Sequence, residues 1–182
     1  MIARIYIPFI TVFASLAACA QTMQKEESLR RFSHYTEIGA LATAKTTPDN
    51  VTTAAFSFQT VNGYRLTPQI FTGIGVGADL FATTTIFPLF GSIRVDMVKK
   101  GDIVPYYFVD AGYGYNATNS PNRSYRGGFA FATGAGLKLN LINNKGFLVS
   151  FGYRYQQASV IENHIRTNAN YNRIALRAGF YF

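Results

Sequence analysis

The chain is poor in the residues that carry most protein chemistry. Its 182 residues include one cysteine, two histidines and no tryptophan, and only 14% of them are charged. One cysteine cannot form an internal disulfide, and a chain of this length buries enough surface without one. The lysines and arginines outnumber the acids but form no cluster interleaved with aromatics, which argues against a nucleic-acid groove. We therefore expect no metal site, no cofactor and no nucleic-acid partner.

Long hydrophobic runs are also missing after residue 20, where no stretch reaches the ~20 apolar residues of a helical membrane span. The beginning of the chain differs. Arg4 supplies a positive charge, residues 5–18 are almost unbroken apolar sequence, and small residues follow. We predict a signal peptide at 1–20, with a membrane anchor as the alternative. Residues 21–32 lack apolar periodicity and are predicted to form a loose tail.

Cys19 stands at the end of this leader and has two interpretations. The sequence LAAC at 16–19 satisfies the lipobox pattern, in which the cysteine becomes the lipidated first residue. The sequence ACA at 18–20 also satisfies the small-x-small rule, with cleavage before Gln21 and loss of the cysteine. Cys19 is thus a candidate lipidation site or a discarded residue. A chain whose own surface is buried in a bilayer gains little from acyl chains, which favours the second interpretation.

From residue 33 onward, apolar side chains alternate with small or polar ones. Successive side chains of a strand point to opposite faces, so a period of two predicts β-strands. In the last run, YNRIALRAGFYF (171–182), Ile174 and Leu176 lie on one face and Arg173 and Arg177 on the other. Eight such runs are present, at 33–44, 51–61, 70–80, 89–97, 107–116, 129–141, 147–156 and 171–182. Turn-forming residues separate them at 47–50, 62–63, 100–102, 119–122 and 143–146.

The charges indicate which face meets lipid. All nine charges inside the runs share one face: Glu37, Asp79, Arg94, Asp96, Asp110, Lys138, Arg154, Arg173 and Arg177. An Arg or Lys facing hydrocarbon at mid-membrane costs ~2–4 kcal/mol, so the charge-free face suits lipid. The charged face is rich in glycine, which suits the narrow interior of a barrel better than the surface of a soluble, lipocalin-like one. Four acids facing five bases predict an ion-pair network in the lumen.

A sheet in lipid must close, because open edges leave backbone groups without partners. About 150 residues accommodate eight spans of ~9–11 residues. We therefore predict an all-β fold at 33–182, an eight-stranded antiparallel up-and-down transmembrane β-barrel with a filled polar lumen. With both termini in the periplasm, the tail at 21–32 is periplasmic. The links near 45–50, 82–87, 117–127 and 157–169 then face outside.

These features resemble those of the small eight-stranded outer-membrane β-barrels, typified by the membrane domain of outer membrane protein A and by opacity-type porin-like barrels. The resemblance covers 33–182 and depends on the eight runs, the lumen of glycine and charge, and the final ALRAGFYF (175–182). It implies the bacterial outer membrane as location, with outer-membrane lipids and lipopolysaccharide as partners. It also implies that Phe180 and Phe182 form the C-terminal signal read by the barrel-assembly machinery. We expect a monomer.

The resemblance implies mainly structural, adhesive or lipid-contacting roles, with enzymes in the minority. We predict a non-enzymatic integral outer-membrane protein with a structural or surface-interaction role through its extracellular loops. Arginines and aromatic rings are expected to fill the lumen and leave no open pore. The alternatives are a lipid-modifying enzyme, of the lipid A deacylase or acyltransferase kind, and a small porin. The partner of the loops cannot be read from the sequence.

The enzyme alternative depends on Glu162 and His164, which lie in the last outer link. A hydrolase needs a nucleophile, a base and an orienting acid within hydrogen-bond reach, and a flexible link does not hold them so. We therefore predict no catalytic residues. Three arginines of the outer links are candidates for lipopolysaccharide phosphates, although ordinary solvated charge is the simpler interpretation: Arg123, Arg126 and Arg166.

Overall fold

The computed structural model describes residues 32–43, 54–81, 85–117, 119–120, 123–141, 145–162 and 165–182. The predicted signal peptide, Cys19 and residues 21–31 of the predicted tail lie outside this part of the chain. Within the described ranges, no helix combines the length and the apolar character needed to cross a bilayer.

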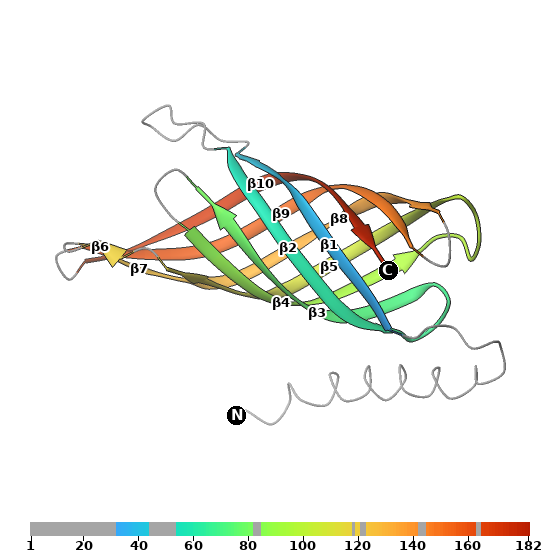
Figure 1. Cartoon of the computed structure of the whole chain (residues 1–182). Coiled ribbons are helices and arrows are strands. Elements are labelled where there is room, and N and C mark those ends of the chain that lie inside the picture. The colour runs from blue at the N-terminus through green and yellow to red at the C-terminus, as the bar shows by residue number, and fades with distance from the viewer. Residues whose placement is uncertain are drawn as a thin grey trace, which may run out of the picture.

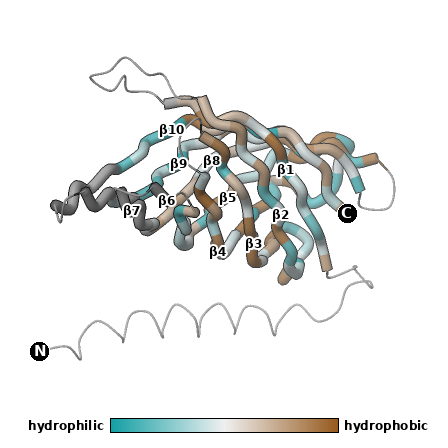
Figure 2. The backbone as a smooth tube through the Cα atoms, turned by 60° about the vertical axis from the view of Figure 1, so that its left-hand side comes forward, coloured by the Kyte–Doolittle hydropathy of each residue, from teal (hydrophilic) through white to brown (hydrophobic). Residues whose placement is uncertain are grey.

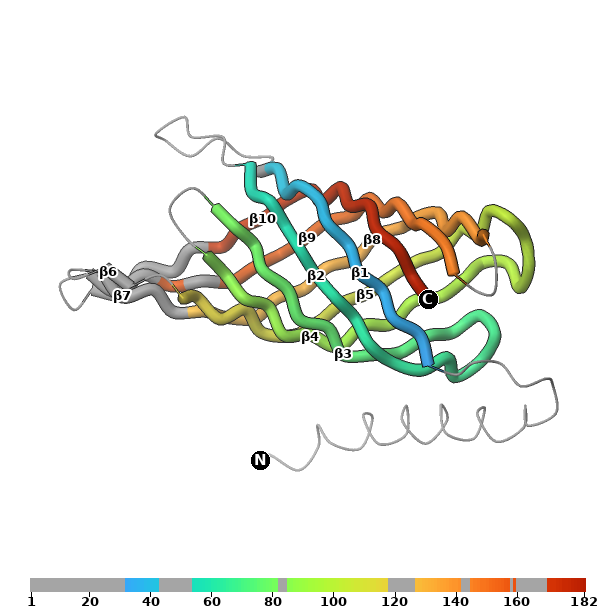
Figure 3. The backbone as a smooth tube through the Cα atoms, in the orientation of Figure 1, coloured from blue at the N-terminus to red at the C-terminus, as the bar shows by residue number. Residues whose placement is uncertain are grey.

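The described residues form ten strands, and eight of them close into a barrel (Figures 1 and 3). Neighbours along the chain pair antiparallel, and β10 pairs with β9 on one side and with β1 on the other, which closes the sheet. The predicted eight-stranded antiparallel up-and-down barrel is confirmed. Its strands are β1 Phe32–Thr43, β2 Ala55–Arg65, β3 Ile70–Leu80, β4 Thr85–Asp96, β5 Ile103–Asn116, β8 Gly128–Asn140, β9 Gly146–Glu162 and β10 Ile165–Tyr181.

Alternation along each strand separates a lumen wall from an outer wall. In β9, Leu148 and Ser150 are buried, whereas Phe147 and Phe151 on the opposite face are more than half exposed. Figure 2 shows apolar segments recurring along β3 and β4. The outer wall of a barrel in lipid must be apolar, because hydrocarbon offers nothing to solvate charge. The sidedness of the strands therefore follows the pattern read from the sequence.

The predicted turn at Asn62-Gly63 is wrong, because β2 continues through both residues to Arg65. Asn62 pairs with β1 and β3 on its two sides, so the closed sheet holds it in the ladder. The chain turns instead at 66–69, where the Thr67 hydroxyl accepts hydrogen bonds from the backbone N–H groups of Gln69 and Ile70 at 3.3 and 3.0 Å. Pro68 lies in this turn, a position that proline favours.

Two predicted outer links contain strands. The link at 117–127 includes the short strands β6 Asn119–Ser120 and β7 Arg123–Arg126, and β7 pairs with β9. The link at 157–169 is wrong over most of its length, because β9 runs to Glu162 and β10 starts at Ile165. Val160, Ile161 and Thr167 are β-branched and favour strand over loop. The β9–β10 ladder therefore continues beyond the rest of the barrel.

The structure describes little of the two remaining predicted outer links, 45–50 and 82–87. Residues 45–50 lie outside the described part of the chain, as do 82–84, and β4 begins at Thr85, inside the predicted link at 82–87.

The buried apolar side chains gather inside the barrel in two clusters, and a small one, toward the end of β1 and the start of β2, contains Leu41, Ala55 and Ala175. The larger one lies toward the end that holds Phe182 and the start of β1 and consists of rings and aliphatic side chains: Tyr35, Val61, Phe71, Phe90, Tyr106, Phe108, Ala132, Leu148 and Tyr181. Tyr35 contacts Phe71 and stacks on Tyr181, with ring centroids 4.7 and 5.7 Å apart. These rings form the frame in which the charged side chains of the lumen are held.

Candidate functional site

The charged lumen is the candidate functional site. All nine predicted charges point inward, and the exposed fraction of each residue is 6% or less. A buried charge is costly unless it is paired and hydrogen-bonded. The partners of each charge therefore decide what this lumen does.

The first cluster lies near the end that holds the termini of the barrel and is centred on Asp96. Lys138 Nζ lies 2.5 Å from Asp96 Oδ1, and Arg65 Nη1 lies 3.2 Å from Asp96 Oδ2. Both cations also donate to the Tyr35 hydroxyl, each at 3.2 Å. Lys138 Nζ is 5.0 Å from the centre of the Tyr106 ring, within cation–π range. Asp96 therefore has two cationic partners.

Arg65 is the lumen charge that the sequence interpretation missed. The predicted turn at Asn62-Gly63 ends the second predicted strand before Arg65, so the set of predicted lumen charges does not include it. The signal that finds it is the same period of two, because Gln59, Val61 and Gly63 occupy the inward positions before it.

The second cluster is centred on Glu37, in β1. Its carboxylate accepts hydrogen bonds from Arg94 at 2.7 Å, from Gln59 at 2.6 Å and from Ser150 at 3.3 Å. The Arg94 guanidinium lies over the Tyr35 ring, 4.3 Å from its centre. These groups come from β1, β2, β4 and β9. The cluster therefore extends across the lumen and fills its cross-section.

The third cluster is nearer the opposite end of the barrel and is centred on Asp79. Arg154 Nη2 lies 2.8 Å from one carboxylate oxygen, and the Ser57 hydroxyl donates to the other at 2.8 Å. Arg173 is close by in the barrel but has a different environment. Its guanidinium lies 3.7 Å from the centre of the Phe81 ring and 4.6 Å from that of Tyr171, so aromatic faces hold it.

Arg173, Asp110 and Arg177 have no salt bridge within the described residues. Both carboxylate oxygens of Asp110 are buried without a hydrogen-bond partner in this part of the chain. Arg177 lies over the Phe108 ring at 5.8 Å, and its Nε and Nη2 atoms are likewise buried and unpaired. The structure thus places the nine charges in one lumen but joins only six of them in ion pairs with one another.

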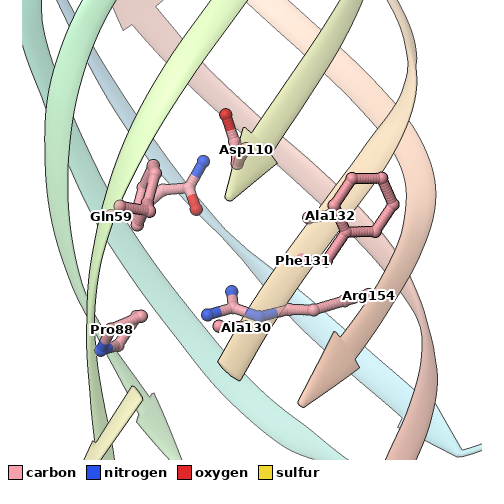
Figure 4. A pocket seen from close by; sticks show the side chains of 8 residues that line it. Gln59, Pro88, Asp110, Ala130, Phe131, Ala132 and Arg154 are labelled. Atoms are coloured by element: carbon pink, nitrogen blue, oxygen red, sulfur yellow. The ribbon is translucent and has the colours of Figure 1, made fainter. Parts of the chain in front are cut away.

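Asp110 borders a small cavity, shown in Figure 4. Its volume is about 10 Å³, and Gln59, Pro88 and Arg154 also line it. This volume is close to the minimum for one water molecule, and the polar lining offers that water several partners. The cavity is too small for a substrate.

No group of three or more His, Cys, Asp or Glu residues suited to a metal ion is found among the described residues. The four lumen acids are each surrounded by different neighbours, and three of them face basic side chains at 3.2 Å or less. In the described structure, the lumen therefore presents no assembled metal site and no paired acid and base around a substrate-sized space.

The remaining predicted site residues lie elsewhere. Phe180 and Phe182 are about half exposed on the outer wall, with their rings stacked 6.3 Å apart. Glu162 ends β9, and His164 lies outside the described residues. Of the three arginines of the outer links, Arg123 is the first residue of β7, Arg126 is its last, and Arg166 lies near the start of β10.

Known structures share this fold at low sequence identity. The crystal structure of Neisserial surface protein A (NspA) is 13% identical and has a TM-score of 0.57, covering 82% of this chain and 95% of that one. The outer membrane protein OprG from Pseudomonas aeruginosa is 10% identical, with a TM-score of 0.54 over 84% and 95%. The N-terminal β-barrel domain of P. aeruginosa OprF is 18% identical, with a TM-score of 0.51 over 81% and 97%.

A scan against protein-family models gives no match, and a search of curated proteins gives none either. The comparisons therefore show the fold: a small eight-stranded barrel like those of these known structures, as the resemblance predicted. At the level of the fold, this agrees with the predicted location, the bacterial outer membrane.

Proposed function

We propose that the chain is a non-enzymatic integral protein of the bacterial outer membrane that has a structural or surface-interaction role and no open pore. The observation that carries the proposal is the filled lumen. Arg94, Arg177, Tyr35, Tyr106 and Lys138 are each less than 2% exposed inside the barrel. An eight-stranded barrel has an interior just wide enough for side chains, and here long charged and aromatic ones occupy it.

The outer end of the barrel supports the surface-interaction part of the proposal. Here β9 and β10 are 17 residues long, whereas β1 has 12 and β2 has 11. The β9–β10 ladder and the short strands β6 and β7 extend past the other strands on one side of the barrel (Figure 1). Binding residues often lie on segments that a scaffold positions, and this extension of the sheet is such a segment.

Planar-bilayer recording tests the absence of a pore. A filled lumen is expected to give no sustained openings, and the double variant Glu37→Ala/Arg94→Ala, which removes the ion pair of the second cluster from the lumen, serves as the comparison. Sustained ohmic conductance by the unaltered protein would identify a small porin and overturn this part of the proposal.

Cell-surface crosslinking tests the interaction role. Deletion of 117–127 is expected to remove crosslinks to an extracellular partner while the barrel keeps its heat-modifiable migration on gels.

The enzyme alternative is addressed separately by lipid A mass spectrometry. A change in lipid A mass that depends on the chain and disappears in His164→Ala would replace the proposal with a lipid-modifying activity.

A further inference from the structure

One patch of the outer wall gathers four polar side chains, whereas most of that wall is apolar. His34 and Thr36 of β1 and Thr60 and Asn62 of β2 point outward, and the two strands set His34 opposite Asn62 and Thr36 opposite Thr60. An isolated polar group facing hydrocarbon is unfavourable, so such a patch needs partners. We refer to these four residues as the outer polar patch.

The patch satisfies part of its own hydrogen bonding. His34 Nδ1 lies 2.6 Å from Asn62 Oδ1, an atom that only accepts, so Nδ1 is the donor. In the neutral ring, Nε2 is then an acceptor, and the hydroxyl of Thr36 lies 2.7 Å from it and that of Thr60 3.4 Å. The nearer hydroxyl, that of Thr36, donates to Nε2, and the amide oxygen accepts from Nδ1, so both are engaged inside the patch.

One strong donor group is left over. The side-chain amide of Asn62 carries two N–H groups on Nδ2, and they donate to no protein atom among the described residues. Asn62 is exposed, and it lines a groove on the outer wall between the rings of Phe32 and Tyr64 and the side chains of Ile74 and Val76. The patch therefore offers hydrogen-bond donors beside an apolar groove.

The depth of the patch matches one part of a lipid. Phe32 begins β1, and His34 follows it by two residues, which is about 7 Å along the strand and about 5 Å in depth for a strand tilted by ~40°. The interfacial layer on each side of a bilayer is roughly 5–8 Å thick. Phe32 and Tyr64 form an edge-to-face pair with centroids 5.6 Å apart, as expected of an aromatic girdle at the interface. The patch thus lies at about the depth where acyl chains join their glycerol.

We propose that this surface binds one diacyl phospholipid of the periplasmic leaflet, whose ester carbonyl oxygens accept from Asn62 Nδ2 while an acyl chain lies in the adjoining groove. The ester region of a phospholipid has acceptors and no donors, which complements what Asn62 leaves unused. A second copy of the chain would bring donors as well as acceptors to this surface, whereas the ester region brings acceptors alone. The inference depends on the proposed membrane placement but not on the role of the loops.

The test compares two lipids that share a headgroup. The purified barrel is mixed with dioleoyl phosphatidylethanolamine or with its dialkyl ether analogue, and native mass spectrometry counts the lipids retained. Because one net hydrogen bond corresponds to about a fivefold change in affinity, the ester lipid is expected to be retained about fivefold better. In Asn62→Leu this preference disappears. Asn172→Leu, a change of an exposed asparagine near the other end of the barrel, keeps it.

Asn62→Asp provides a second variant, because it keeps the shape of the side chain but replaces the two N–H donors by an acceptor. It is expected to lose the preference as well. Heat-modifiable migration reports separately whether each variant forms the barrel. Equal retention of the two lipids by the unaltered protein would overturn the proposal, as would a preference that survives in both Asn62 variants. Dimers that depend on Asn62 would assign the patch to a second copy and overturn it too.

Discussion

The two halves of the lumen are built differently. Toward the termini, Asp96 and Glu37 hold three bases, and each acid accepts several hydrogen bonds. Toward the other end, Arg154 and Asp79 are paired, but Asp110, beside a small cavity, forms no salt bridge with the described residues, and Arg173 is held by aromatic rings. We infer that the first half closes and stabilises the barrel, whereas the second tolerates substitution and admits water. Each prediction below tests this comparison, from the largest expected effect to the smallest.

Replacing Glu37 is expected to be the most damaging change. Glu37→Gln leaves Arg94 buried without an acid, and breaking a buried pair from one side costs about 3–5 kcal/mol. The free energy of unfolding, measured by urea titration of the barrel in phospholipid vesicles, is expected to fall by that amount. The double variant Glu37→Gln/Arg94→Met removes the orphaned charge and is expected to recover most of the loss. A single variant as stable as the parent would show that this half is not the stabilising one.

Lys138→Met is expected to have a smaller effect, because Asp96 keeps Arg65 at 3.2 Å. The loss of one charged hydrogen bond costs about 1.5–3 kcal/mol. The same urea titration measures it, and adding Arg65→Met is expected to lower the stability by more than the sum of the two single changes. Strict additivity would mean that the two cations do not substitute for each other.

Asp110→Asn is expected to have the smallest effect, within about 1 kcal/mol of the parent in the same assay. The carboxylate has no partner among the described residues, and burying an amide costs less than burying an unpaired charge. A loss as large as that of Glu37→Gln would reveal an essential partner for Asp110 and remove the contrast between the two halves.

Much of the fold could be predicted from the sequence, because charged side chains of a closed sheet in lipid can face only the lumen. Glu37, Arg94 and Arg177 were assigned to the lumen from the period of two, and each is at most 2% exposed. The failures came from local signals that the ladder overrides. Asn62-Gly63 has the composition of a turn yet is held between β1 and β3, and this error also hid Arg65.

The partners of each charge were beyond the sequence. Glu37 and Arg94 are 57 residues apart, and Lys138 and Asp96 are 42 apart. Which side chains meet depends on the stagger between strands and on the closure of β10 against β1, which a one-dimensional pattern does not encode. The same holds for the outer polar patch, since His34 and Asn62 are 28 residues apart and only the β1–β2 register sets them side by side.

The order of residues by itself determined which side of the sheet each side chain occupies, because consecutive residues of a strand must point in opposite directions and charge is excluded from hydrocarbon. Only the tertiary structure decided that Asp96 forms salt bridges with two cations, whereas Asp110 forms none with the described residues. Ion pairing depends on distances of a few ångströms across the barrel, and those distances exist only once the sheet has closed.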